Sequence, residues 1–191
     1  MNNKPTAAEI ERFLDEDIGS GDITANIIPE ATQAKAIVIA RERMLLCGQA
    51  WFDAVFSRLN PSVEINWLVG EGDVCEENTR LCELYGSARD LLTGERTALN
   101  LLQTLSAVAS NAKQYADAVS GTQCKILDTR KTIPGLRNAQ KYAVACGGCV
   151  NHRIGLYDGV LIKENHIMAA GSIAKAVSAA RKISDVPVEV E

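Results

Sequence analysis

Cationic side chains gather in one segment of the chain, residues 125–166. The segment holds seven lysines and arginines against three acids, a formal balance of +4, in a chain whose net charge is −4. Both histidines, His152 and His166, also fall in it. A cationic island in an acidic chain favours a pocket for a small polyanion and disfavours a nucleic-acid surface. The competing interpretation is a solvated charged face. The cations are Lys125, Arg130, Lys131, Arg137, Lys141, Arg153 and Lys163.

Three of these cations could hold an anion in different ways. Arg130 offers a planar fork for a carboxylate or phosphate, whereas the adjacent Lys131 offers a point charge. Lys163 follows an apolar run, so we expect the stem of its side chain to be buried. A buried lysine needs an anionic partner or must lose its charge. Two roles therefore stay open for Lys163, namely an anion ligand and a Schiff-base amine.

The elements that must position these residues are short apolar strands alternating with helices. The pattern predicts strands over 125–128, 159–162 and 186–191, and helices over 138–145 and 172–183. Such alternation is typical of parallel βα units, in which ligand groups lie at the carboxyl ends of the strands. Arg130 and Lys131 follow the first strand, Lys163 ends the second, and Glu191 falls in the third.

A glycine pair precedes His152 and Arg153 and suits a close approach of the backbone to a ligand. The pair lies inside Cys146-Gly-Gly-Cys149, a C-x-x-C motif. A redox motif of this kind should open a helix after a strand, and zinc would need a second pair of ligands at suitable spacing. Neither condition is met in the sequence, so we interpret the motif as a coincidence.

The first half of the chain predicts a helix followed by a largely antiparallel sheet. Thr6-Ala-Ala-Glu9 is a capping box that starts a helix, which Gly19 ends. Residues 36–40 are apolar on both faces and predict a strand covered on each side, whereas 63–69 alternate as in a half-buried strand. The remaining predictions are a helix over 48–59, a turn at 70–73, a strand over 80–85, and a long helix from beyond Gly94, with a seam of small residues, that ends at Gly121.

Composition limits the class of protein. An apolar content of 47% in 191 residues is ordinary for a folded globular chain. The N-terminus lacks the apolar stretch of a secretory signal, and no run of about 18 apolar residues could cross a membrane. We therefore expect a cytoplasmic protein with no membrane contact. The six cysteines are expected to be buried free thiols and not a disulfide framework.

Several ordered blocks of the sequence resemble one enzyme family. The chain is similar to quinolinate phosphoribosyltransferase, also called nicotinate-nucleotide pyrophosphorylase (carboxylating), over essentially its whole length. The blocks are Thr93-Gly-Glu-Arg-Thr-Ala-Leu-Asn100, Leu127-Asp-Thr-Arg-Lys-Thr-Ile-Pro-Gly-Leu-Arg137, Lys141-Tyr-Ala-Val144, Asn151-His-Arg153 and Leu161-Ile-Lys-Glu-Asn-His166.

This resemblance implies an α/β fold with two domains. Residues 1–110 would form an N-terminal open α/β sandwich with a linking helix. Residues 111–191 would form the first βα units of a phosphoribosyltransferase-type α/β barrel, whose remaining units would be absent.

The resemblance also implies a reaction and a site. Phosphoribosyl transfer from phosphoribosyl pyrophosphate to quinolinate, with decarboxylation, would give nicotinate mononucleotide, CO2 and pyrophosphate, with Mg2+ as the expected metal. Lys131, Lys163 and Glu191 would be catalytic, Glu191 would help to hold Mg2+, and Arg96 would act across a homodimer interface. The substrate-binding residues would be Arg96, Thr129, Arg130, Lys131, His152, Arg153, Lys163 and His166.

Two departures from the family pattern bear on activity. Cys149 stands where the family usually has a third glycine, and the later barrel strands, with a further acidic metal ligand and a phosphate loop, would be absent. We therefore expect the 191-residue chain to be inactive by itself. Three alternatives stay open: a Schiff-base enzyme acting through Lys163, a phosphoribosyltransferase acting on nicotinate, and a non-catalytic module for anion binding or subunit association.

Overall fold

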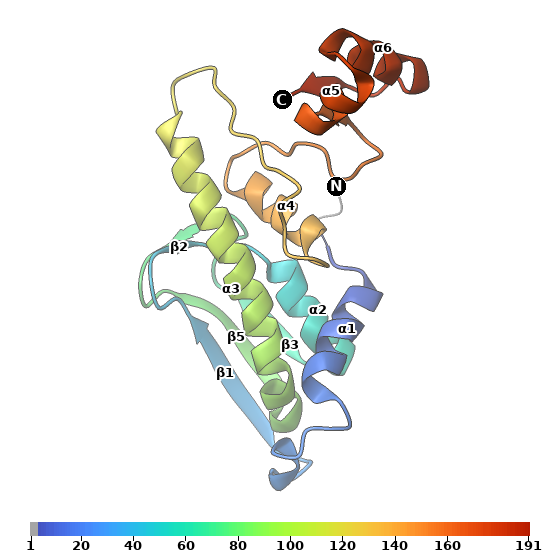
Figure 1. Ribbon diagram of the computed structural model, residues 1–191. Helices are drawn as coiled ribbons and strands as arrows, with labels where there is room; N and C mark the ends of the chain where they lie inside the picture. The colour runs from blue at the N-terminus through green and yellow to red at the C-terminus, as the bar shows by residue number, and fades with distance from the viewer. Residues whose placement is uncertain (1–3) are drawn as a thin grey trace.

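The computed structural model describes residues 4–191, which form a larger N-terminal part and a smaller C-terminal unit (Figure 1). The larger part contains an antiparallel sheet in the strand order β1-β5-β3. Its strands are β1 (Gln33–Ile39), β5 (Arg80–Ser87) and β3 (Glu64–Trp67). A short antiparallel pair, β2 (Met44–Leu45) and β4 (Val74–Cys75), lies beside it, and a 3-10 turn, η1 (Ala25–Ile27), precedes the sheet.

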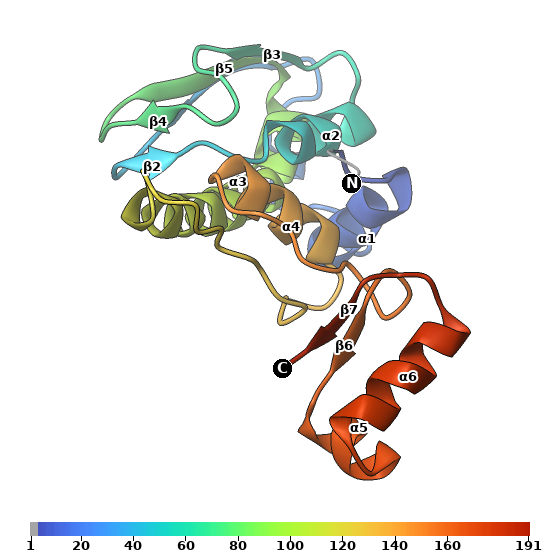
Figure 2. The same cartoon turned by 90° about the horizontal axis from the view of Figure 1, so that it is seen from above.

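Three helices belong to the larger part: α1 (Ala7–Ile18), α2 (Gln49–Leu59) and α3 (Ala88–Ala118). The helices α2 and α3 cover one face of the sheet (Figure 2). The predicted capping box is confirmed, because the Thr6 hydroxyl accepts from the Glu9 amide while the Glu9 carboxylate accepts from the Thr6 amide. The main core lies between these helices and the sheet, and its largest fully buried side chain is Phe52.

The strands predicted for this part are present, but the burial predicted for one of them is wrong. In β3, Ile65 and Trp67 pack against the core while Glu64 and Asn66 are exposed, as the alternation predicts. The prediction that residues 36–40 are covered on both sides is wrong. Among residues 4–191, β1 pairs with β5 alone and is an edge strand, and the Ile37 side chain is 45% exposed. Ala36 and Val38 pack against the core, so one face of β1 is covered and the other is not.

The long helix α3 begins before the regular pattern that follows Gly94, at the N-cap that Ser87-Ala-Arg-Asp90 indicates in the sequence. It starts at Ala88, with the Ser87 hydroxyl accepting from the Asp90 amide, and it runs through Gly94 without a break. A Cβ atom at Gly94 would lie 2.8 Å from side-chain atoms of Leu59 and Phe56 on α2. Gly94 therefore permits the close crossing of the two helices and does not mark a helix end.

The C-terminal unit is built from parallel βα elements. Helix α4 (Arg137–Cys146) packs on α3 and adds Ala139 and Ala143 to the main core. Beyond it, β6 (Val160–Ile162) pairs in parallel with β7 (Val188–Val190) through α5 (Glu164–Ala170) and α6 (Ile173–Ile183). Figure 2 shows these four elements projecting from the larger part. Their own core contains only three buried side chains, Ile162, Ala176 and Ala180.

The predicted α/β class is confirmed, with two differences in the C-terminal unit. The strand expected over 125–128 is reduced to a single parallel bridge between Leu127 and Val150. The helix α5 was not predicted, because its seven residues are too few to show a helical period. Within residues 4–191, no helix combines the length and the apolarity needed to cross a lipid bilayer.

Candidate active site

Seven of the nine residues predicted to bind substrate or metal line one cleft, at the carboxyl ends of the short parallel elements. Its volume is about 300 Å3. The Leu127 bridge, the loop after Val150, and the ends of β6 and β7 each contribute side chains. The lining residues are Asp128, Thr129, Arg130, Lys131, His152, Arg153, Leu161, Lys163 and Glu191. The four cationic side chains converge on one space, so they do not form a merely solvated face.

A buried ion pair forms the floor of the cleft. The Lys141 ammonium on α4 lies 2.5 Å from the Asp128 carboxylate, and the two side chains are 0% and 8% exposed. The ammonium also donates to the His152 carbonyl at 3.0 Å. Asp128 in turn accepts from the His152 amide at 2.8 Å and from the Asn151 side chain at 2.7 Å. This network joins α4 to the strand end at Asp128 and fixes the backbone that presents His152 and Arg153.

The loop after Arg153 is closed by Asp158. Its carboxylate accepts from the Ile154 amide at 2.8 Å and from the Gly155 amide at 2.9 Å. These two backbone hydrogen bonds hold the pKa of Asp158 below its ordinary value of 3.8. The Arg153 guanidinium donates to the Gly159 carbonyl at 3.1 Å, which orients it toward the cleft from this loop.

Two carboxylates, one on β7 and one on the residue after it, face His152 and Lys163 of the cleft. Glu189 lies 2.5 Å from Nε2 of His152, and Glu191 is paired with the Lys163 ammonium. The hydrogen bond from Lys163, and then its charge, lower the pKa of Glu191, with smaller effects from Lys131 and Arg153. Glu191 is thus an ionised carboxylate beside the cationic cluster, and its oxygens could bind a metal ion.

Arg130 contributes a hydrogen-bond donor without a partner. The Nε of Arg130 is buried and has no hydrogen-bond partner among the described residues 4–191. A buried unsatisfied donor is costly and rare in native structures, and an anion in the cleft could accept from it.

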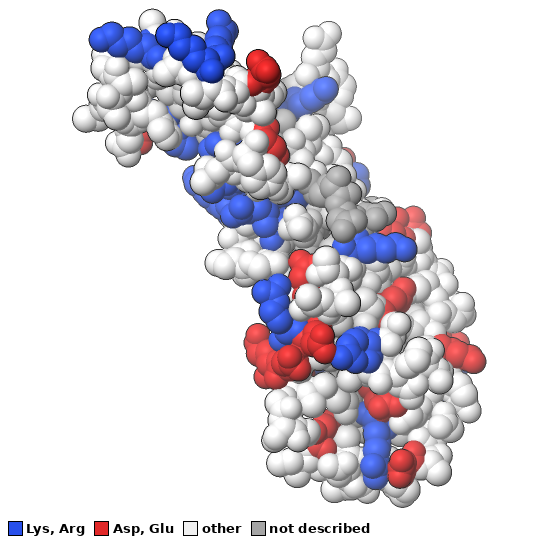
Figure 3. All heavy atoms as spheres, turned by 90° about the vertical axis from the view of Figure 1, so that its right-hand side faces the viewer, with Lys and Arg blue, Asp and Glu red and all other residues white. Residues whose placement is uncertain are grey.

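Positively charged side chains are also unevenly distributed over the surface of the whole molecule. In Figure 3, lysine and arginine side chains gather in two places, at the outer end of the C-terminal unit and where that unit meets the larger part of the molecule. Most acidic side chains in that view lie on the larger part. The separation of charge predicted from the sequence is therefore also a separation in space.

Comparison with known proteins gives a family for this arrangement. The family models for the N-terminal and C-terminal domains of quinolinate phosphoribosyl transferase match residues 22–106 and 108–191. The nicotinate-nucleotide pyrophosphorylase structure from Francisella tularensis is 47% identical, with a TM-score of 0.91, over 98% of this chain and 69% of that one. The chain belongs to the quinolinate phosphoribosyltransferase family.

Two curated relatives of the family extend the comparison. Each is named as a probable nicotinate-nucleotide pyrophosphorylase (carboxylating). The protein from Synechocystis is 41% identical over 182 residues, and the protein from Bacillus subtilis is 40% identical over 191 residues. This chain spans 62% and 66% of their lengths.

Two of the residues predicted for the family site lie elsewhere. Arg96 is exposed on α3 and does not line the cleft. His166 is exposed and its Nδ1 accepts from the Lys163 amide, so it caps the start of α5 and also lies outside the lining. Within this chain, neither residue is brought together with the cluster.

Three residues that organise the site were not predicted: Asp128, Lys141 and Glu189. Each acts through another residue of the cleft, as the contacts above describe. A signal for Asp128 was present, because it ends the short apolar run of Ile126 and Leu127. Lys141 shares its helix face with Arg137 and Asn138, so the sequence contained no sign of its burial. Nothing in the sequence indicated Glu189.

The cysteines follow the prediction except for one. Cys47, Cys75, Cys82 and Cys149 are buried, Cys146 is partly buried, and Cys124 is exposed. The Cys149 thiol lies 3.2 Å from the Ala112 carbonyl on α3, so the side chain that replaces the usual glycine is accommodated against that helix.

Proposed function

We propose that this chain supplies the quinolinate-binding and phosphoribosyl pyrophosphate-binding residues of a decarboxylating quinolinate phosphoribosyltransferase. The products would be nicotinate mononucleotide, CO2 and pyrophosphate. One observation carries the proposal: Arg130, Lys131, Arg153 and Lys163 line a single cleft of about 300 Å3. A doubly carboxylated ring next to a sugar pyrophosphate is the kind of ligand that such a cluster suits.

The residue types divide between the two substrates. Arg130, His152, Arg153 and Lys163 would hold the two carboxylates of quinolinate, with the unpaired Nε of Arg130 as one donor. Thr129 and Lys131, at the edge of the same cleft, would meet the phosphoribosyl pyrophosphate. Hydrogen-bond donors that are positively charged and fixed in place stabilise the negative charge that develops on the leaving pyrophosphate.

The chemistry proceeds without an organic cofactor. The pyridine nitrogen of quinolinate attacks C1 of the sugar as the bond from C1 to the pyrophosphate oxygen breaks. The ring nitrogen then carries a positive charge. The electron pair of the adjacent carbon–carboxylate bond can therefore stay on that ring carbon as CO2 leaves, stabilised by the neighbouring positive nitrogen, and a proton then takes the place of the carboxylate.

Glu191 is the residue of this chain that would hold Mg2+. Its ionised carboxylate at the mouth of the cleft is a suitable oxygen ligand, and Mg2+ is commonly bound by one or two carboxylates together with substrate phosphates. Bound Mg2+ would supply neutralisation of the pyrophosphate charge. Lys163, which is paired with Glu191, would have to share or release that carboxylate.

Arg96 is proposed to act in the site of a second copy of the chain. It is exposed on α3 and outside the cleft of its own chain, which is compatible with that role. A mixture of Arg96→Ala and Arg153→Ala chains tests it, because one site of each mixed dimer would keep both arginines. Recovery of quinolinate binding in the mixture supports the proposal, and no recovery contradicts it.

Calorimetric titration of the 191-residue chain with quinolinate tests the main proposal directly. Arg153→Ala removes a charged donor that is worth about 1.5–3 kcal/mol, so we expect Kd to rise roughly tenfold to a hundredfold. Arg181→Ala, an exposed residue of α6 outside the cleft, is the matched control and should not change Kd. Equal binding of nicotinate and quinolinate would favour the single-carboxylate alternative.

Turnover separates the enzyme from a non-catalytic module. Release of labelled CO2 from quinolinate, with phosphoribosyl pyrophosphate and Mg2+, is measured on this chain and on a version that carries the additional length of the relatives. We expect binding but no CO2 from the 191-residue chain, and CO2 from the longer version. Binding without CO2 release from either would leave anion binding or subunit association as the function.

A further inference from the structure

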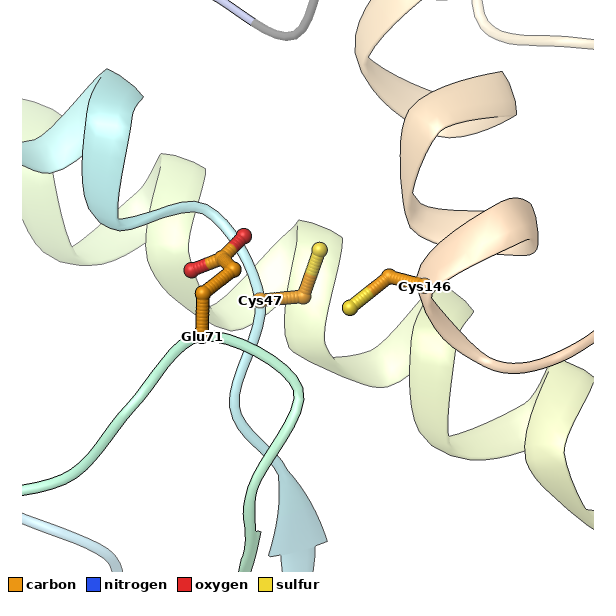
Figure 4. Close-up of side chains that lie close together, drawn as sticks. All are labelled: Cys47, Glu71 and Cys146. Carbon is orange, nitrogen blue, oxygen red and sulfur yellow. The ribbon is translucent and has the colours of Figure 1, made fainter.

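A second cluster of reactive side chains lies away from the cleft. It consists of Cys47 in the loop before α2, Glu71 in the turn before β4, and Cys146 at the end of α4 (Figure 4). Their two sulfur atoms and a carboxylate oxygen all lie within 4.8 Å of one another. None of the three lines the cleft, and the proposed reaction uses none of them.

Two of the three residues, Glu71 and Cys47, are held in place by neighbours that lie outside the cluster. The two Glu71 oxygens accept from the Gly48 amide at 2.8 Å and from the Gln49 amide at 3.1 Å. Cys47 is 0% exposed, and both its amide and its carbonyl are bonded to the Ser106 hydroxyl of α3 at 3.0 Å. Hydrogen bonds of this kind orient metal ligands in proteins and reduce the cost of bringing them together.

The electrostatics of the cluster favour a cation. The hydrogen bond between the two thiols raises the pKa of Cys47 and lowers the pKa of Cys146, while burial and the Glu71 charge act to raise both. Burial, and then the same carboxylate, raise the pKa of the neighbouring Tyr142 hydroxyl. No lysine or arginine of the described residues contributes to these shifts. The C-terminal end of α4, where Cys146 lies, adds the negative end of a helix dipole.

We propose that Cys47, Glu71 and Cys146 form a binding site for a thiophilic divalent cation, with Zn2+ as the representative ion. Zn2+ takes Cys sulfur at about 2.3 Å and carboxylate oxygen at about 2.0–2.2 Å, so ligand atoms around one ion lie roughly 3.5–4 Å apart. The three ligand atoms lie within 4.8 Å of one another, an upper limit that is compatible with that geometry. Since Cys146 and Glu71 are only partly buried, water can complete a tetrahedral set. Mg2+, which prefers oxygen ligands, is disfavoured here.

A disulfide between Cys47 and Cys146 is the competing interpretation. It leaves Glu71 without a role at the cluster. The Glu71 carboxylate would then face a neutral disulfide, with the Gly48 and Gln49 amides as its hydrogen-bond donors. A cation instead removes the repulsion among the three groups. By joining two loops of the larger part to the end of α4, it would stabilise the helix that also carries Lys141.

Titration of the reduced chain with Zn2+, and with Co2+ for its thiolate charge-transfer absorption, tests the proposal. Cys124→Ser serves as the background, because it removes the exposed thiol. We expect one ion per chain and a higher Tm on binding. Cys146→Ser and Glu71→Gln should each weaken binding by at least about tenfold. The control Cys149→Ala should bind as the background does, because the Cys149 thiol faces Ala112 on α3.

Two results would overturn the proposal. One is the absence of stoichiometric Zn2+ binding by the reduced protein, including the case in which Cys47 and Cys146 only form a disulfide on oxidation. The other is loss of binding in Cys149→Ala together with unchanged affinity in Glu71→Gln, which would assign the ion to the C-x-x-C thiols. Because Cys146 and Glu71 are partly exposed, their variants are expected to fold even if a Cys47 variant does not.

Discussion

At the scale of single residues, the Lys141 ammonium is the group on which the shape of the cleft depends most. It is fully buried and bonded both to Asp128 and to the His152 carbonyl. Neither contact is with a ligand, so Lys141 is a positioning residue. Its removal should first affect folding and then the placement of His152 and Arg153.

Lys141→Met is expected to destabilise the chain by about 3–5 kcal/mol, because it leaves the Asp128 carboxylate buried without its cation. The free energy of unfolding in urea measures this change. Lys113→Met is a matched control. It removes one partner of an exposed pair with Asp117, whose side chains are 39% and 62% exposed, and should cost less than about 1 kcal/mol. Equal losses in the two variants would contradict the buried pair as the organiser of the site.

Asp158 gives a prediction about pH. Because its folded pKa lies below 3.8, its ionised form stabilises the loop above that pH, and the contribution is lost as the pH falls through the folded value. The urea midpoint of the unchanged chain should therefore exceed that of Asp158→Asn at pH 7, and the difference should shrink toward zero below pH 3.8. A difference that stays constant or grows on acidification would show that the carboxylate charge is not the cause.

At the scale of elements, the position of α4 against α3 connects the two parts of the molecule. Helix α4 presents Lys141 to the cleft and Cys146 to the second cluster, while it packs on α3. The crossing is close at Gly147, where a Cβ atom would lie 2.4 Å from the Ala109 carbonyl and 2.6 Å from the Ala112 Cβ. The atoms that it would meet include helix backbone, which cannot move independently.

Gly147→Ala is therefore expected to destabilise the chain by about 1–3 kcal/mol or more, since overpacking against backbone forces α4 away from α3. Thermal unfolding measures the loss. Gly121→Ala is the control, because its φ is +79° but no atom lies within 4 Å, so only backbone strain of about 1 kcal/mol is added. A Gly147→Ala chain as stable as the Gly121→Ala chain would contradict the tight crossing.

At the scale of the whole molecule, the two parts are stabilised unequally. The main core contains more than twenty buried residues, whereas the unit made by β6, α5, α6 and β7 contains three. The same unit and the loop before it expose large apolar side chains, among them Leu156, Met168 and Ile183, which are 74%, 78% and 83% exposed. A two-stranded sheet is marginal by itself, and its open edges can pair with other chains.

We therefore expect the 191-residue chain to self-associate or aggregate as its concentration rises. Size-exclusion chromatography with light scattering measures the mass. Ile183→Lys should reduce the association, because it places a charge in the exposed apolar surface of the C-terminal unit. Ile23→Lys is the matched control in the larger part, where the side chain is 85% exposed, and should have little effect. A monodisperse monomer at all concentrations would contradict the prediction.

The sequence determined the features that depend on local order. The capping box at Thr6, the end of α1 at Gly19 and the alternation in β3 follow from the chemistry of neighbouring residues, and each is present. The separation of charge along the chain also predicted a cationic cleft, because parallel strands bring their carboxyl ends to one edge.

Only the tertiary structure decided which distant groups meet. The pairing of Lys141 with Asp128, the approach of Glu189 to His152, and the meeting of Cys47 and Glu71 with Cys146 join segments 13 to 99 residues apart in the chain. Local propensity and periodicity contain no information at that separation. These contacts arise because α4 packs on α3 and because β6 pairs with β7, and burial then selects the partners that can satisfy one another.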